Sequence, residues 1–185
     1  SIYGGVNLWG ANDEFKNSSD LYSISLEENI SSNFDNYRDT ILIIDNKEKE
    51  VSSSVGHELM NEHPFSELRF SQAFENISKL NLILKSGNLQ EFCLLVESEA
   101  LTLHSLMMSS DPSYLLMKPE TLTVIEEIQK FRILSNIPIC FTLDAGANVH
   151  VLYPDKNSHE VSEFIKNNLS NYCANGRFID DIIGK

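Results

Sequence analysis

Two apolar segments typical of buried strands, residues 138–143 and 149–153, are separated by only five residues, Asp144-Ala145-Gly146-Ala147-Asn148. The Gly and Asn in this connection favour a tight turn with positive φ. We therefore predict a hairpin here, and a hairpin commits the chain to an antiparallel sheet.

The remaining elements give the sheet its partners. The β-branched run Thr40-Ile41-Leu42-Ile43-Ile44 predicts a buried strand over 39–45, and residues 178–183 predict a last strand. Apolar residues at helical spacing predict helices over 64–84 and 89–109, a third from Lys118-Pro119-Glu120 and a fourth with Ser158 as its N-cap. Residues 1–10 contain a short strand, and residues 11–37 form a polar surface excursion with a weak helical piece near 26–34. Helices segregated onto an antiparallel sheet predict a two-layer α+β domain.

Charge and composition exclude several classes of function. The 185 residues carry a formal net charge of −13, from 14 basic and 27 acidic side chains. We therefore expect no nucleic-acid partner and no membrane partner. The cysteines Cys93, Cys140 and Cys173 lack the spacing of a disulfide framework or a metal site, and indicate reduced, buried thiols in a cytoplasmic protein. Because the chain begins abruptly at Ser1 without an initiator Met, we expect it to come from the middle of a longer protein.

Asp144 is the first candidate for chemistry, because it ends an apolar strand beside a Gly-containing turn. A carboxylate there can face a cleft and orient or deprotonate a substrate hydroxyl. The alternative is a turn cap, in which the side chain accepts a hydrogen bond from a nearby main-chain N–H.

Ser52-Ser53-Ser54 form the second candidate, between a predicted strand and a predicted helix. Hydroxyls and main-chain N–H groups at a helix start can bind phosphate, and they can equally cap the helix. For His104, within the second long helix, we expect a core position or a helix–helix hydrogen bond.

Four stretches carry a family resemblance. They are Ser1-Ile2-Tyr3-Gly4-Gly5 with Trp9, Val51-Ser52-Ser53-Ser54-Val55-Gly56, Glu97 to Leu101 with Leu103-His104, and Phe141-Thr142-Leu143-Asp144-Ala145-Gly146-Ala147-Asn148. In this order and at these distances, they resemble the C-terminal half of the diphosphomevalonate decarboxylases, which belong to the GHMP kinase superfamily.

The resemblance implies a ferredoxin-like GHMP kinase C-terminal fold, with residues 1–10 ending a nucleotide-binding half and residues 11–185 forming the substrate-side domain. It implies that the complete enzyme uses ATP and Mg²⁺ to convert mevalonate diphosphate to isopentenyl diphosphate, ADP, phosphate and CO₂. Asp144 matches the catalytic aspartate, and Ser53, between Ser52 and Ser54, matches a serine that contacts the diphosphate. The fragment alone, lacking its N-terminal half, is expected to bind no cofactor and to be inactive, and a homodimer is one expected assembly.

Two positions depart from the family pattern. Members commonly carry Pro in place of Ala147, and some bacterial members carry Arg in place of Ser54. Without that Arg a charge-assisted contact to the diphosphate is lost. A related kinase or decarboxylase acting on mevalonate or its monophosphate is therefore an alternative. Another is a non-catalytic homologue that binds a partner through residues 11–37 and 106–117.

Overall fold

The computed structural model describes residues 4–26, 30–46 and 63–182. Its regular elements are, in chain order, β1 (Asn7–Trp9), β2 (Ser23–Ser25), η1 (Ser32–Phe34), β3 (Tyr37–Leu42), α2 (Ser66–Ser86), α3 (Leu89–Ser109), α4 (Pro119–Ser135), β4 (Cys140–Leu143), β5 (Val149–Pro154), η2 (Asp155–Asn157), α5 (Ser158–Phe164), a π-helical turn η3 (Ile165–Leu169), η4 (Ser170–Tyr172), η5 (Ala174–Gly176) and β6 (Phe178–Ile182).

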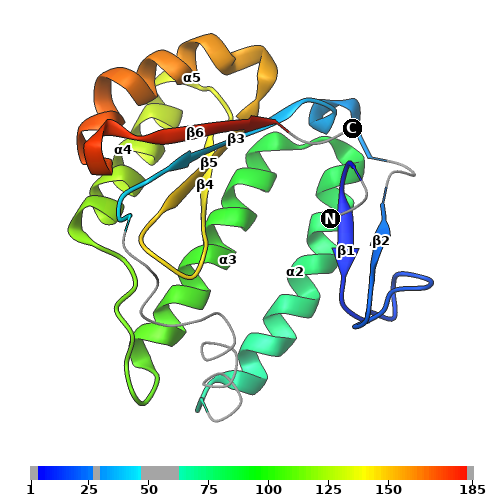
Figure 1. The fold of residues 1–185 in the computed structure, drawn as a ribbon. Helices are drawn as coiled ribbons and strands as arrows, with labels where there is room; N and C mark the ends of the chain where they lie inside the picture. Colours follow the sequence, from blue (N-terminus) through cyan, green and yellow to red (C-terminus); the bar gives the residue numbers. More distant parts are fainter. Residues whose placement is uncertain (1–3, 27–29, 47–62, 183–185) are drawn as a thin grey trace.

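The main sheet has four strands in the order β4-β5-β3-β6, and every neighbouring pair is antiparallel (Figure 1). Because β3 and β4 are both antiparallel to β5, they run parallel to each other with β5 between them. This is the split βαβ arrangement of ferredoxin-like folds. The helices α2, α3 and α4 form the first crossover, and α5 forms the second. The predicted ferredoxin-like α+β fold is therefore confirmed.

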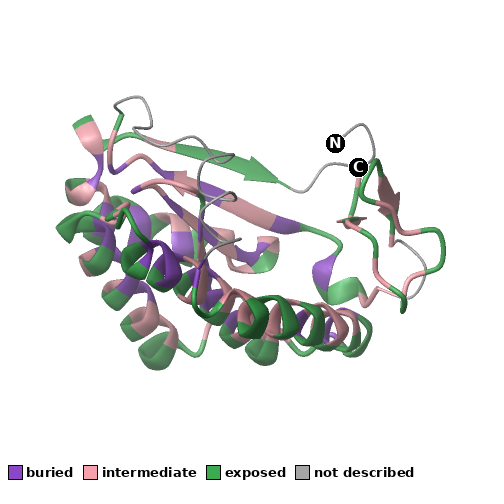
Figure 2. Ribbon diagram, turned by 90° about the horizontal axis from the view of Figure 1, so that it is seen from below, coloured by how far each residue is buried: buried purple, intermediate pink, exposed green. Residues whose placement is uncertain are grey.

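The main core lies between one face of this sheet and the helices α3, α4 and α5. Alternate residues along the strands point into it, and Leu42, Phe141, Val149 and Val151 are fully buried. Phe131 of α4 stacks on Phe164 of α5 with ring centroids 4.1 Å apart. Figure 2 shows the buried residues gathered between the sheet and the helices, while the outer sides of the helices are exposed.

A second, smaller cluster joins α2 and α3 to the start of β3. Phe34, Tyr37 and Phe92 pack with their ring centroids 5.1–5.6 Å apart. Gly87, between the two helices, has φ +73°, and a Cβ there would lie 2.3 Å from the Ser31 hydroxyl oxygen. Only glycine therefore fits this left-handed, crowded turn.

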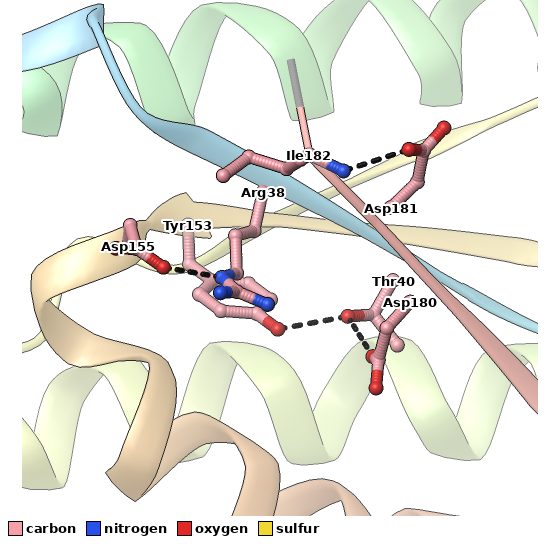
Figure 3. Close-up of polar contacts among 7 residues, drawn as sticks. All are labelled: Arg38, Thr40, Tyr153, Asp155, Asp180, Asp181 and Ile182. Atoms are coloured by element: carbon pink, nitrogen blue, oxygen red, sulfur yellow. Dashed lines mark hydrogen bonds and ion pairs between the residues drawn. The ribbon is translucent and has the colours of Figure 1, made fainter. Parts of the chain in front are cut away.

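The outer strand β6 is attached to the sheet by a chain of side-chain hydrogen bonds (Figure 3). The Thr40 hydroxyl donates to Asp180 at 2.8 Å, so the Tyr153 hydroxyl, also 2.8 Å from it, must donate to Thr40. Beside them, Arg38 forms an ion pair with Asp155. Burial raises the pKa of Tyr153, which keeps its hydroxyl protonated as a donor.

Several local predictions are corrected by the structure. Ser158 is the first residue of α5 and not its N-cap, because Asn157 occupies that position. Of the helical piece expected near 26–34, only the short 3₁₀ turn η1 lies in the described part, which omits 27–29. Among the described residues the positive-φ positions include none in 144–148, so the β4–β5 connection turns without the left-handed residue expected of it.

The surface excursion expected over 11–37 is wrong in part, because this range contains β2 and the buried residues Phe34 and Tyr37. The other predicted helices and strands correspond to described elements, with ends shifted by a few residues. Within the described ranges, no helix combines the length and the apolar composition needed to cross a membrane. The three cysteines are free thiols and are buried, as predicted.

Candidate active site

Asp144 immediately follows β4 and is exposed. Its Oδ1 atom accepts the main-chain N–H of Ala145 at 2.6 Å, and its main-chain oxygen accepts the N–H of Gly146 at 2.7 Å. The first contact is the hydrogen bond expected of a turn cap. It also restrains the carboxylate, which remains at the surface where a substrate can reach it.

Side chains from two helices hold the turn that carries Asp144. His104 of α3 is 2% exposed, and its Nε2 atom lies 3.2 Å from the main-chain oxygen of Asp144. Because a carbonyl oxygen only accepts, Nε2 donates in this contact. Thr121 of α4 is fully buried and donates its hydroxyl to the main-chain oxygen of Ala147 at 2.8 Å.

The electrostatic state of His104 suits the role of a neutral donor. Burial lowers the pKa of the imidazole, and its hydrogen bond to the Asp144 carbonyl opposes that shift only in part. A neutral imidazole has a single N–H group, and the geometry assigns it to Nε2.

A buried ion pair fixes the two helices relative to the start of β4. Arg132 of α4 contacts Glu97 of α3 through two nitrogens, and one of them also donates to the main-chain oxygen of Ile139 at 2.8 Å. The Arg132 and Glu97 side chains are only 12% and 5% exposed. The hydrogen bond to Glu97 raises the pKa of Arg132, which therefore stays charged.

The end of β3 also reaches this turn. The main-chain N–H of Asp45, three residues beyond β3, donates to the Oδ1 atom of Asn148 at 3.1 Å. Ser52, Ser53 and Ser54 lie outside the described residues, so their predicted phosphate-binding role remains a prediction.

Sequence reasoning missed the partners of His104 and Thr121. The core position expected for His104 is confirmed, but its hydrogen bond goes to the main chain of the β4–β5 turn and not to another helix. Thr121 lies in the first turn of α4, where its hydroxyl also accepts the N–H of Lys118 at 3.1 Å. A threonine three residues after Lys118 was a visible signal for that local contact, but no local pattern indicates the contact with Ala147.

Two hollows of the described surface lie away from Asp144. A groove of about 850 Å³ follows α2 and α3, and a hollow of about 300 Å³ lies between α4 and α5. Asp144 lines neither of them. The described residues also contain no group of three or more histidine, cysteine or carboxylate side chains arranged to hold a metal ion.

The chain is similar to a family described as the mevalonate 5-diphosphate decarboxylase C-terminal domain, whose model matches residues 40–181. A comparison with curated protein sequences gave no match.

Solved structures of mevalonate diphosphate decarboxylases resemble this chain over its whole length. The mevalonate diphosphate decarboxylase of Staphylococcus aureus is 25% identical, with a TM-score of 0.83. That of Enterococcus faecalis is 20% identical, with a TM-score of 0.78. A third structure, described as MDDEF in complex with MVAPP, AMPPCP and magnesium, is 22% identical with a TM-score of 0.79. Each similarity covers 100% of this chain but only 54%, 55% and 56% of the respective solved chains, so this chain spans about half their length.

Proposed function

Because the chain belongs to the mevalonate 5-diphosphate decarboxylase C-terminal domain family, we propose that it is the substrate-side half of an ATP-dependent mevalonate diphosphate decarboxylase. The observation that carries the proposal is the position of Asp144. Its exposed carboxylate ends a strand of the sheet, in a turn that His104 and Thr121 hold from two different helices.

The proposed chemistry of Asp144 concerns the tertiary hydroxyl of mevalonate diphosphate. The carboxylate accepts a hydrogen bond from that hydroxyl, or its proton, as the oxygen becomes a nucleophile. Loss of phosphate and CO₂ from the phosphorylated intermediate then gives isopentenyl diphosphate. A carboxylate held by its own turn performs this step better than a mobile one, because the turn has already restricted its orientation.

We assign recognition of the diphosphate to Ser53, with Ser52 and Ser54 beside it. Hydroxyls and main-chain N–H groups bind phosphate oxygens without a basic side chain. The contact between Asp45 and Asn148 supports this assignment, because it brings the chain that leads into this segment next to the turn of Asp144.

ATP would supply the transferred phosphoryl group, with Mg²⁺ bound to it. The described residues do not fit that role, since no group of metal-binding side chains lies together among them. On the basis of the family resemblance, we assign nucleotide binding to an N-terminal half of the complete protein, which residues 1–10 would end and which the domain formed by residues 11–185 would follow. A structure of similar fold is described in complex with AMPPCP and magnesium, which supports the use of ATP and Mg²⁺ by the complete protein.

Two further properties of the protein remain proposals. The three buried, unpaired cysteines fit a cytoplasmic protein, because disulfides are rare in that compartment. A homodimer of the complete enzyme stays a prediction.

The test is turnover by the complete protein with ATP and Mg²⁺ on mevalonate, its monophosphate and its diphosphate. Release of ADP and CO₂ from the diphosphate alone is the expected result. Preference for a less phosphorylated substrate would favour the related kinase or decarboxylase, to which Ser54 in place of Arg points. Absence of turnover on all three would favour a non-catalytic homologue.

The same assay on purified residues 1–185 tests whether this half acts alone. We expect no ATP-dependent turnover, because positioning the nucleotide is most of the catalysis of phosphoryl transfer. Measurable turnover by this chain would contradict the assignment of ATP to another part of the protein.

A further inference from the structure

Two polar contacts bracket β4, one at each end. Before the strand, the main-chain oxygen of Ile139 accepts a hydrogen bond from Arg132, which is paired with Glu97 of α3. After the strand, the main-chain oxygen of Asp144 accepts a hydrogen bond from His104 of α3. Glu97 and His104 both belong to the buried side of α3. The helix therefore fixes the strand's position at its start and at its end.

The hydrogen bond from His104, at the end of β4, acts on Asp144, whose side chain is exposed. The bond from His104 restrains the carbonyl group of Asp144, and the N–H of Ala145 restrains Oδ1 of the same residue. Hydrogen bonds therefore restrain both the main chain and the side chain of Asp144, which limits the rotation of its carboxylate. The N–H of Gly146 also donates to that carbonyl at 2.7 Å, but this contact is internal to the turn, whereas the His104 bond ties the turn to α3.

We propose that His104 is a positioning residue that sets the orientation of the Asp144 carboxylate toward the substrate hydroxyl. The proposal rests on the proposed function, in which Asp144 acts on that hydroxyl. Because His104 is only 2% exposed, we place it behind the turn, where it acts through the main chain of Asp144 and not by direct contact with the substrate.

His63 provides a comparison within the chain. It is also buried, at 5% exposed, but its Nε2 lies 3.1 Å from the Ser109 hydroxyl and its Nδ1 accepts the N–H of Phe65. Those contacts are a side-chain bond and a local main-chain bond near the start of α2. In contrast, the one N–H group of His104 donates to the main-chain oxygen of Asp144, which lies 40 residues further along the chain and has an exposed carboxylate.

The test uses the complete protein with two substitutions at His104 and one control. His104→Leu removes the donor and keeps an apolar side chain of similar size, while His104→Gln retains an N–H donor at comparable reach. The control is Thr40→Val. Like His104→Leu it removes a buried hydrogen-bond donor, but Thr40 lies in the middle of β3 and donates to Asp180, not to the turn of Asp144. Each variant is assayed for kcat and KM with mevalonate diphosphate. Amide hydrogen exchange of residues 145–148 is measured in parallel.

We expect His104→Leu to lower kcat by about 10- to 100-fold, the scale on which small misplacements of reacting groups act, with KM changed by less than about threefold. Exchange at residues 145–148 should become faster in this variant and remain unchanged in Thr40→Val. His104→Gln should keep kcat and the exchange rates at residues 145–148 close to those of the wild type. If kcat of His104→Leu stays within twofold of the control, His104 only fills the core and the proposal is wrong.

The exchange measurement separates this proposal from the proposed function. If the wild-type complete protein does not turn over mevalonate diphosphate, the function fails but the exchange result still applies. Unchanged exchange at residues 145–148 in His104→Leu would then show that His104 does not hold the turn. Should His104→Leu fail to fold, His104→Gln decides: wild-type exchange and turnover support the donor role, and loss of both in a folded protein contradicts it.

Discussion

Arg132 and Glu97 form a buried ion pair between α4 and α3, with N–O distances of 2.5 and 2.8 Å. Arg132→Met would leave the Glu97 carboxylate in a site only 5% exposed, without its cation. Breaking such a pair from one side typically costs about 3–5 kcal/mol of unfolding free energy, whereas replacing both partners with apolar residues costs much less. We therefore expect Glu97→Leu to recover much of the loss when it is added to Arg132→Met.

Urea denaturation of the purified chain measures both effects, and the same helix offers a control. Lys130 and Glu127 form an exposed pair on α4, with side chains 65% and 31% exposed. Lys130→Met should cost less than about 1 kcal/mol, as exposed pairs generally do. An Arg132→Met variant as stable as Lys130→Met would show that the buried pair is unimportant for stability.

The direction of the hydrogen bonds through Thr40 gives a second prediction. Thr40→Val removes the hydroxyl that links Tyr153 to Asp180 and leaves the buried Tyr153 hydroxyl without its acceptor. It should therefore lower the free energy of unfolding by about 1–3 kcal/mol. Tyr153→Phe removes only the terminal donor and leaves the Thr40–Asp180 bond intact, so it should cost less. Denaturant midpoints rank the two variants. A larger loss for Tyr153→Phe would contradict the assigned direction.

Burial of His104 predicts a pH dependence of stability. Its pKa in the folded chain is lowered from the ordinary value of about 6.5. Below pH 6.5 the unfolded chain binds a proton at this residue that the folded chain does not, so this contribution to stability is lost as the pH falls from 6.5 toward the folded pKa. The slope from one such group is at most about 1.4 kcal/mol per pH unit.

The comparison with His104→Gln isolates this group, because glutamine does not titrate. Unfolding free energies of both proteins, measured from pH 7.5 to pH 5.5, should diverge, with the wild type losing more. Parallel curves for the two proteins would mean that His104 takes up its proton equally in the folded and unfolded states.

The sequence predicted elements well where the pattern is local. Helices α3 and α4 begin at positions marked by Asn88 and by Pro119, and the hairpin of β4 and β5 follows from two apolar runs close together. The sheet order became predictable only through the family resemblance, because strand pairing between residues more than 100 positions apart leaves no local signal.

The candidate site was predicted in part, for the same physical reason. Asp144 is marked by its own neighbours in the chain, so a strand followed by an acid and a Gly-containing turn pointed to it. The supports of that turn come from His104 and Thr121, which are distant in sequence, and only the packing of α3 and α4 against the hairpin brings them there. Exposed apolar residues on α2, such as Leu68 at 72%, further show that helical spacing alone does not identify the buried side.

Ser53 carries a prediction about substrate binding in the complete protein. If its hydroxyl holds the diphosphate, far from the reacting carbon, it stabilises ground state and transition state alike. Ser53→Ala should then raise KM more than it lowers kcat, by an amount corresponding to one hydrogen bond to a charged group, about 1.5–3 kcal/mol. Steady-state kinetics with mevalonate diphosphate measures the two constants. A KM equal to that of the wild type would remove Ser53 from the binding site.

The most direct test of the account is kcat of Asp144→Asn in the complete protein, measured together with its melting temperature. Asparagine keeps an Oδ1 acceptor for the N–H of Ala145, so the turn and the fold should be preserved. It cannot accept the hydroxyl proton, so kcat should fall by at least about 100-fold at an unchanged melting temperature. If Asp144 serves only as a turn cap, kcat will stay within a few-fold of the wild type, and that result would contradict the catalytic role.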